Sequence, residues 1–359
     1  MEKTAAGKTR NVNGGRSWVV TFGEIMMRLA PPGYLRLTQA RSFDIIYGGG
    51  EANVAVTLAN FGQPARFVTR LPDNDLGRAC QMYIGQYGVD TSSMVWGGDR
   101  LGLYFHEFGA MQRGSKVVYD RAGSSLAAIQ PGMVDWDDAF RDAGWFHFTG
   151  ITPAVSRGAA EACLEAATRA RELGLVVSCD LNFRAKLWNW GVTASDFMPK
   201  LTVLTHVAIG NEEDADKVFG IKAPETDVTA GKVSGEKYRY VAEELVRRFP
   251  NLEKVAITLR GSKSASYNTW SGLYFDGRDH YMASVHEVTH MVDRVGGGDA
   301  FAGGLIHALR QFPDKPQQVV DFAVAASCLK HSIVGDFNLV STDEVEKLMK
   351  GDASGRVAR

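Results

Sequence analysis

The sequence predicts an α/β fold, in which a mostly parallel sheet carries helices on both faces and a small β-sheet is added to it. Along most of the chain, apolar runs of strand length alternate with helical patterns, which is typical of parallel strands joined by crossover helices. Between about residues 89 and 125 short alternating runs follow one another with glycine turns and no helix. With 45% hydrophobic and 23% charged residues, the 359-residue chain also has the composition of a globular protein with a sizeable core.

The first strand and helix units lie in residues 18–87. A buried strand is predicted over 18–27, closed by the turn Pro31–Gly33. The glycine run Gly48–Gly50 leads into a helix with apolar residues at helical spacing, and Gly62 ends it. A strand over 66–69 and a helix over 76–87 follow.

The central flap consists of short runs over 94–96, 101–108 and 116–121. We expect an antiparallel lid, formed from about 35–47 and 92–125, that excludes water from a site. The alternative is an inert surface hairpin.

The alternation resumes after the flap. Strands are predicted over 145–148, 175–180, 206–209 and 254–259, and helices over 157–173, 238–249, 300–310 and 317–331. Residues 266–275 predict a hairpin with Ser271–Gly272 at its turn. Together these elements indicate a single domain over 18–349, with a disordered arm or tag at 1–17 and a frayed tail at 350–359.

Charge and cysteine content narrow the class of protein. A formal net charge of −1 provides no electrostatic footprint for nucleic acid or an anionic membrane. No apolar run approaches the roughly 20 residues that cross a bilayer, and the polar start is not a secretory signal. The four cysteines form no CxxC pair, which favours reduced thiols over a disulfide framework. We therefore expect a cytoplasmic protein without nucleic-acid or membrane partners.

The most informative stretch is 293–301, which reads DRVGGGDAF. Three glycines precede a helical pattern, so they lie where backbone N–H groups lack partners and a phosphate can approach without meeting a Cβ. Asp299 would stand beside that anion, where a carboxylate suits a base that takes a proton from an attacking hydroxyl. The alternative is an ordinary glycine loop with Asp299 as an N-cap.

Residues 286–290 match HExxH, a motif that binds zinc when both histidines lie on one helical face. The surrounding β-branched residues favour a strand, in which His286 and His290 would lie about 13 Å apart. A zinc peptidase is therefore disfavoured.

Two stretches, GGGEANVA at 48–55 and DRVGGGDAF at 293–301, together resemble the paired signatures of the ribokinase/PfkB carbohydrate kinases. The resemblance extends over about residues 18–349. It implies a ribokinase-like three-layer α/β/α sandwich with a small β-sheet lid, ATP as phosphoryl donor, Mg²⁺ as cofactor, and lids that often pair into homodimers.

Within the family, the chain is most similar to kinases of 2-keto-3-deoxygluconate, through LYF at 103–105, VYDRAGS at 118–124 and DLNFR at 180–184. A sugar acid carries a carboxylate, which guanidinium groups hold with charge-assisted bonds. The resemblance implies that the sugar acid is bound by Gly48, Gly49, Asn53, Tyr104, Tyr119, Arg121 and Arg184.

The resemblance also implies which residues act on the phosphate groups and the metal ion. Asp299 is the implied catalytic base, and Gly296, Gly297 and Gly298 form the anion hole. The implied nucleotide contacts are Thr258, Arg260, Gly261 and Gly298, and Asn211 and Asp214 are expected to hold Mg²⁺ through water. Three positions depart from the family pattern: Gly297 replaces alanine, Asp214 replaces glutamate, and Arg260 stands where glycine is frequent.

We therefore expect an ATP-dependent kinase that phosphorylates the primary hydroxyl of a keto-sugar acid, with 2-keto-3-deoxygluconate converted to its 6-phosphate. Two alternatives stay open: a fructokinase- or ribokinase-like kinase of a neutral sugar, and a non-catalytic sugar-binding relative. Neither the sugar epimer nor a need for a monovalent cation follows from these residues.

Overall fold

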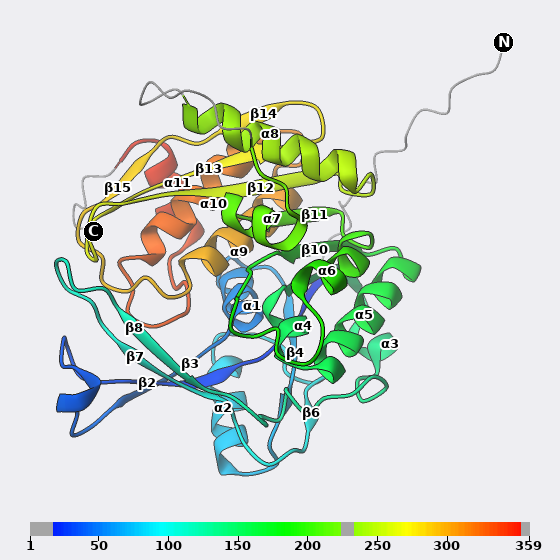
Figure 1. The fold of residues 1–359 in the computed structure, drawn as a ribbon, viewed down its shortest axis with the longest axis vertical. Coiled ribbons are helices and arrows are strands. Elements are labelled where there is room, and N and C mark those ends of the chain that lie inside the picture. Colours follow the sequence, from blue (N-terminus) through cyan, green and yellow to red (C-terminus); the bar gives the residue numbers. More distant parts are fainter. Residues whose placement is uncertain (1–16, 224–232, 353–359) are drawn as a thin grey trace.

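A long, mostly parallel sheet forms the centre of the molecule (Figure 1). The computed structural model describes residues 17–223 and 233–352, so the predicted tail after 352 and almost all of the predicted arm lie outside the described residues. The strand order is β14-β13-β12-β11-β10-β9-β1-β4, with β15 also paired to β13. In this order, adjacent strands between β4 and β12 run parallel to each other. The strands β13, β14 and β15 are attached by antiparallel pairing. The strands are β1 (Trp18–Phe22), β4 (Ala65–Val68), β9 (Ala143–Thr149), β10 (Val176–Asp180), β11 (Val207–Gly210), β12 (Lys254–Ser262), β13 (Asn268–Phe275), β14 (His280–Met282) and β15 (His286–Val288).

Helices cover both faces of this sheet, which confirms the predicted three-layer α/β/α arrangement. Successive side chains of a strand point to opposite faces, so Val19 packs in one apolar core and Val20 in the other. The first core is covered by α1 (Gly50–Asn60), α2 (Asp75–Gly85), α9 (Gly297–Gln311), α10 (Pro316–Lys330) and α11 (Thr342–Met349). The second lies under α3 (Trp136–Ala139), α4 (Ile151–Val155), α5 (Arg157–Glu172), α6 (Ala194–Thr202), α7 (Glu212–Phe219) and α8 (Val233–Arg248).

A separate four-stranded sheet stands beside the main body, at the lower left of Figure 1. We call it the lid sheet; it consists of β2 (Met26–Ala30), β3 (Asp44–Gly48), β7 (Leu103–Glu107) and β8 (Lys116–Asp120), in the order β3-β2-β7-β8. The register places Ile46, Arg28, Tyr104 and Tyr119 in one row across the four strands. The neighbouring row, on the opposite face, is Ile45, Leu29, Phe105 and Val118.

The lid sheet differs from the predicted flap in its strands. The segment 18–27, predicted as one strand, divides at 23–25 into β1 of the main sheet and β2 of the lid sheet. As a result β2 and β7 pair in parallel, so the sheet is not purely antiparallel. The predicted strand 94–96 is β6 (Val95–Trp96), which pairs with β5 (Arg70–Leu71) outside the lid sheet. Residues 37–39 form a short 3₁₀ helix, η1 (Leu37–Gln39).

The predicted hairpin with its turn at Ser271–Gly272 is wrong. Both residues lie inside the continuous strand β13, and the turn instead joins β12 to β13 at residues 263–267. Gly272 is required by packing, because a Cβ there would come within 2.9 Å of Val324 and 3.1 Å of Phe301 on the covering helices. A glycine inside a strand here marks a close approach of neighbouring elements.

Candidate active site

A cavity of about 640 Å³ lies at the carboxyl ends of the parallel strands, between the starts of α1 and α9 and the lid sheet. Crevices at this edge of an open α/β sheet are the usual place for ligands. The structure brings nearly all of the predicted site residues to this cavity: Gly48, Gly49, Asn53, Tyr104, Tyr119, Arg121, Arg184, Asn211, Asp214, Thr258, Arg260, Gly296, Gly297, Gly298 and Asp299. Gly261 is predicted with them but does not line it; its missing Cβ leaves room for Thr269 of β13.

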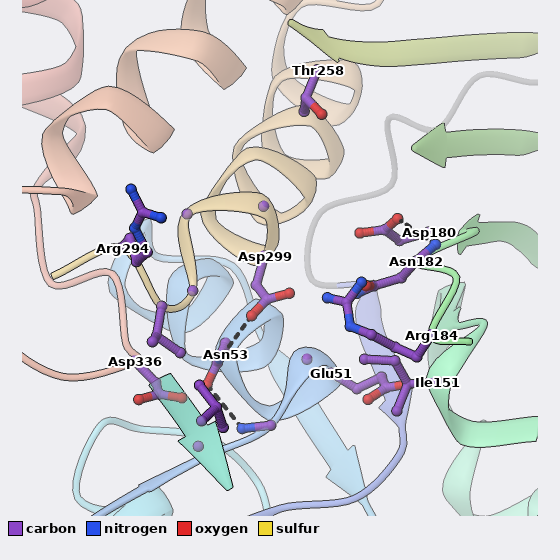
Figure 2. A pocket seen from close by; sticks show the side chains of 18 of the residues that line it. Glu51, Asn53, Ile151, Asp180, Asn182, Arg184, Thr258, Arg294, Asp299 and Asp336 are labelled. Carbon is purple, nitrogen blue, oxygen red and sulfur yellow. Dashed lines mark hydrogen bonds between the residues drawn. The ribbon is translucent and has the colours of Figure 1, made fainter. Parts of the chain in front are cut away.

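Asp299 projects into the cavity from the first turn of α9 (Figure 2). Its carboxylate accepts a 2.6 Å hydrogen bond from the side-chain amide of Asn53 on α1. Burial raises the pKa of Asp299 to about 6, while the bond from Asn53 and the charges of Arg184 and Lys330 oppose the shift. A carboxylate with this pKa is charged at neutral pH and is a stronger base than an exposed aspartate.

The glycine run forms the start of α9. Gly296 has a φ of 82°, which favours glycine, and a Cβ there would overlap the main-chain carbonyl of Asp336. Gly297 packs against the ring of His331, whereas a Cβ on Gly298 would meet open space. No side chain caps this helix start, so Asp299 is not the ordinary N-cap that the sequence left as an alternative.

The inner face of the lid sheet contributes Tyr104 and Tyr119, whose ring centroids lie 5.9 Å apart. The hydroxyl of buried Tyr104 donates to the carboxylate of Asp336, whereas Tyr119 is 53% exposed. Beneath them, buried Arg28 of β2 forms 2.7 Å ion pairs with both Asp293 and Asp336. The lid sheet is therefore joined to the two loops that flank the glycine run.

The two arginines expected to hold a sugar carboxylate differ in their surroundings. Arg121 already has a partner, since its guanidinium forms an ion pair with buried Glu24. Arg184 donates to the neighbouring main-chain carbonyl of Phe183, and no carboxylate of the described residues lies within ion-pair distance of it. Figure 2 shows its guanidinium extending into the cavity toward Asp299. Arg184 thus forms no direct ion pair among the described residues, although its charge lowers the pKa values of Asp299, Asp180 and Asp214 against the rise that burial causes.

A group of acidic and amide side chains lies at the ends of β10 and β11. Asp214 and Asn211 form a capping box at the start of α7, in which both Asp214 oxygens accept backbone N–H groups. Asp180 is buried nearby, and burial together with the charges of Asp214 and Asp299 raises its pKa well above the usual range. Glu213 lines the same part of the cavity. The group is rich in oxygen ligands and gains from a nearby cation, because its carboxylates repel one another.

Basic residues gather at the end of β12. Arg260 and Arg294 both line the cavity, and burial together with the charge of Arg294 lowers the pKa of Arg260. Two neighbouring guanidinium groups are stabilised when an anion such as a phosphate binds between them. Thr258 lies on the same strand, with its hydroxyl 3.4 Å from the carbonyl of Gly210.

The sequence-based assignment missed several charged residues that line the cavity, among them Glu24, Asp180, Arg294 and Asp336. Asp180 and Arg294 stand inside the quoted motifs but were given no role. Glu24 and Asp336 stand outside every motif, so their positions depend on the tertiary fold.

Comparison with known proteins agrees with this geometry. The model of the pfkB family of carbohydrate kinases matches residues 17–340, most of the chain. The chain belongs to this family. A 2-dehydro-3-deoxygalactonokinase of Haloferax volcanii is 34% identical over 339 residues, covering 94% of this chain and 98% of the relative. The crystal structure of a 2-dehydro-3-deoxygluconokinase from Thermotoga maritima is 45% identical, with a TM-score of 0.87 over 94% of this chain and 99% of that one.

A more distant structure, a fructokinase from Xylella fastidiosa solved with bound ATP, is 21% identical and shares the fold, with a TM-score of 0.76. It covers 94% of this chain and 100% of its own. As a pfkB-family kinase, the protein is a phosphotransferase that acts on a sugar and uses ATP. Within the described residues no helix is long and apolar enough to span a bilayer.

Proposed function

We propose that the protein transfers the γ-phosphate of ATP to the primary hydroxyl of a 2-keto-3-deoxy sugar acid, with 2-keto-3-deoxygluconate converted to its 6-phosphate. One observation carries the choice of a sugar acid: Arg184, which has no direct ion pair among the described residues, extends into the cavity toward Asp299, the base in this proposal. A neutral sugar would leave this guanidinium without a direct ion pair, whereas a sugar carboxylate would bind it with charge-assisted hydrogen bonds. The two relatives above, named as kinases of 2-dehydro-3-deoxy sugar acids, support the same substrate class.

The residues of the cavity have distinct roles in this proposal. Asp299, oriented by Asn53, takes the proton of the sugar hydroxyl as it attacks the phosphorus. The backbone N–H groups at the start of α9, beside Gly296, Gly297 and Gly298, stabilise the negative charge on the transferred phosphoryl group. Gly48, Gly49, Tyr104 and Tyr119 contact the sugar, while Thr258 and Arg260 face the nucleotide together with Arg294.

Mg²⁺ fits the acidic group formed by Asp180, Asn211, Glu213 and Asp214. These side chains offer oxygen ligands, and a cation would stabilise the charged form of Asp180, whose pKa is raised by burial and by the charges of Asp214 and Asp299. When bound, the ion would neutralise charge on the phosphates of ATP. Because both oxygens of Asp214 already accept backbone hydrogen bonds, we propose that Asp214 and Asn211 act through metal-bound water.

The substrate assignment is tested by coupled assays of ADP release with a panel of sugars. We expect kcat/KM for 2-keto-3-deoxygluconate or its galactonate epimer to exceed that for fructose or ribose by about 10–10²-fold, the strength of a charge-assisted bond to Arg184. A neutral sugar as the best substrate would overturn the sugar-acid assignment. Sugar binding without any ADP release would indicate a non-catalytic relative.

We also propose that the lid sheet pairs with that of a second copy of the chain. Its outer row, Ile45, Leu29, Phe105 and Val118, is apolar, yet Ile45 is 57% exposed and Val118 41% exposed. An apolar sheet face of this kind is expected to be covered by a partner. Sedimentation velocity should give a dimer that becomes a monomer in Val118→Glu; an unmodified monomer would contradict the proposal.

A reducing compartment such as the cytoplasm suits the thiols. Cys80, Cys163, Cys179 and Cys328 are all free, and the first three are buried in the core. Four reactive thiols on titration of the denatured protein purified without reductant would agree with this location.

A further inference from the structure

The chain passes between the main body and the lid sheet through four linkers. The lid strands lie in two continuous stretches of the described chain, 26–48 and 103–120, so each stretch has one entry and one exit. A change in the tilt of the lid sheet over the cavity has to take place at these linkers. They are residues 23–25 before β2, Gly49 after β3, 97–102 before β7 and 121–125 after β8.

Glu24 joins all four linkers. It belongs to the first, and its buried carboxylate accepts hydrogen bonds from Arg121 and from the hydroxyl of Ser124 in the fourth. In the third, a Cβ on Gly102 would come within 2.8 Å of a Glu24 carboxylate oxygen. In the second, Gly49 lies so close to the main-chain carbonyl of Glu24 that a Cβ would overlap it. One residue is thus the junction between the lid sheet and the main body.

Glu24 is connected to Arg121 through its side chain and to Asp299 through its main chain. Arg121 lines the cavity; its ion pair with Glu24 uses Nη2, and its Nε has no partner among the described residues. The guanidinium therefore has donors left for a second carboxylate. On the main-chain side, the N–H of Gly49 donates to the side-chain oxygen of Asn53 at 3.2 Å, and the amide of Asn53 donates to Asp299.

These two connections lead to opposite ends of the proposed substrate. A 2-keto-3-deoxy sugar acid has its carboxylate at one end of the carbon chain and its primary hydroxyl at the other. Arg121 is expected to contact the carboxylate, and Asp299 is the base for the hydroxyl, so both ends are held relative to Glu24. Such alignment is valuable, because a misplacement of about 1 Å can cost about 10²-fold in rate.

We propose that Glu24 is a positioning residue that makes phosphoryl transfer depend on the carboxylate of the sugar acid. The inference rests on the proposed function, a kinase of a sugar acid. Glu24 fixes the guanidinium of Arg121, the sugar carboxylate binds the remaining donors of that guanidinium, and the primary hydroxyl is thereby placed at Asp299. A neutral sugar forms no ion pair with Arg121, so its phosphorylation depends much less on the charge of Glu24.

Glu24→Gln tests this role, because it keeps the length of the side chain and removes its charge. We expect kcat for the sugar acid to fall by about 10–10²-fold, while kcat for fructose falls by no more than about threefold. KM for the sugar acid should stay the same or decrease, because the charge of Arg121 is no longer neutralised. Equal losses of kcat for the acid and for fructose would assign Glu24 a purely structural role and overturn the proposal.

Gly102→Ala reaches the same carboxylate from outside the cavity. Gly102 does not line the cavity, and a Cβ there would press on the Glu24 carboxylate and on Met26. We expect the same selective loss of kcat for the sugar acid, and this variant decides the question if Glu24→Gln does not fold. Gly114→Ala is the matched control, because a Cβ on Gly114, between β7 and β8, would meet open space; its kcat should stay within about twofold.

A second readout does not depend on turnover. In the sugar-free protein, backbone amides of 97–102 and 121–125 should exchange hydrogen faster in Glu24→Gln and Gly102→Ala than in Gly114→Ala, because the linkers lose their common anchor. Unchanged exchange would overturn the junction at Glu24. A neutral sugar as the best substrate of the unmodified protein would refute the proposed function, whereas equal losses in a confirmed sugar-acid kinase would refute only the role of Glu24.

Discussion

The side-chain amide of Asn53 donates a 2.6 Å hydrogen bond to the carboxylate of Asp299, although 246 positions separate the two residues. The bond joins the starts of helices α1 and α9, which pack together over one face of the main sheet. It orients the carboxylate and leaves Asp299 acceptor capacity for the sugar hydroxyl. The two signature stretches of the sequence thus meet at a single pair of side chains.

Replacing Asp299 tests the base directly. Asp299→Asn keeps the shape of the side chain but cannot accept a proton, so kcat should fall by about 10²–10⁴-fold while sugar affinity stays nearly unchanged. Steady-state kinetics and calorimetric titration with the sugar give the two quantities. Near-normal turnover would remove Asp299 from the mechanism.

The pH dependence should follow the pKa of Asp299, which burial raises to about 6. The base must be deprotonated, so activity is retained above this pKa and lost as the pH falls through it. We expect kcat/KM at pH 5 to be about tenfold below that at pH 7. Asn53→Ala removes a hydrogen bond that favours the charged carboxylate of Asp299. The acidic limb of the pH profile of kcat/KM should therefore lie at higher pH in this variant. An identical limb in this variant would show that another group sets the profile.

Arg184 should distinguish sugar acids from neutral sugars. Arg184→Gln removes the unpaired cation of the cavity, so KM for the sugar acid should rise by about 10–10²-fold, the strength of a charge-assisted bond, with little change for a neutral sugar. Arg121→Gln is the matched comparison. This substitution leaves buried Glu24 without its cationic partner, so it should lower the free energy of unfolding as well as the affinity for the sugar. Equal losses for charged and neutral sugars in Arg184→Gln would contradict contact with the carboxylate.

Much of the site could be predicted because its residues lie in short contiguous motifs. The glycines and Asp299 follow one another at a helix start, where local chain geometry alone defines an anion site. Glu24 and Asp336 could not be found in this way, since each becomes part of the cavity only through distant partners, Arg121 for the first and Arg28 and Tyr104 for the second. Local pattern does not encode such long-range pairing.

The same limit explains the errors in the fold. Gly272 has the appearance of a turn residue in the sequence, but its role is to let α9 and α10 approach β13. The strand predicted over 18–27 is continuous in apolar pattern, yet the chain changes sheets within it. Tertiary packing decided both cases, whereas the longer periodic helices were predicted within a few residues of their bounds.

The buried ion pairs of Arg28 should make a large contribution to stability. Arg28 is fully buried and pairs with Asp293 and Asp336 at 2.7 Å each, so Arg28→Met leaves two buried carboxylates without their cation. We expect the free energy of unfolding at neutral pH to fall by about 3–5 kcal/mol, measured by urea denaturation. Arg141→Met is the matched control, because it breaks an exposed pair with Asp138 and should cost at most about 1 kcal/mol.

The pH dependence of that loss separates charge from packing. Burial already raises the pKa of Asp336 against the opposing charge of Arg28, and removal of the guanidinium raises it further. A group whose pKa is raised on folding takes up a proton as the pH falls, so the deficit of Arg28→Met relative to the unmodified protein should shrink below neutral pH. A deficit that is constant with pH would assign the loss to packing around the side chain of Arg28 instead of to its charge.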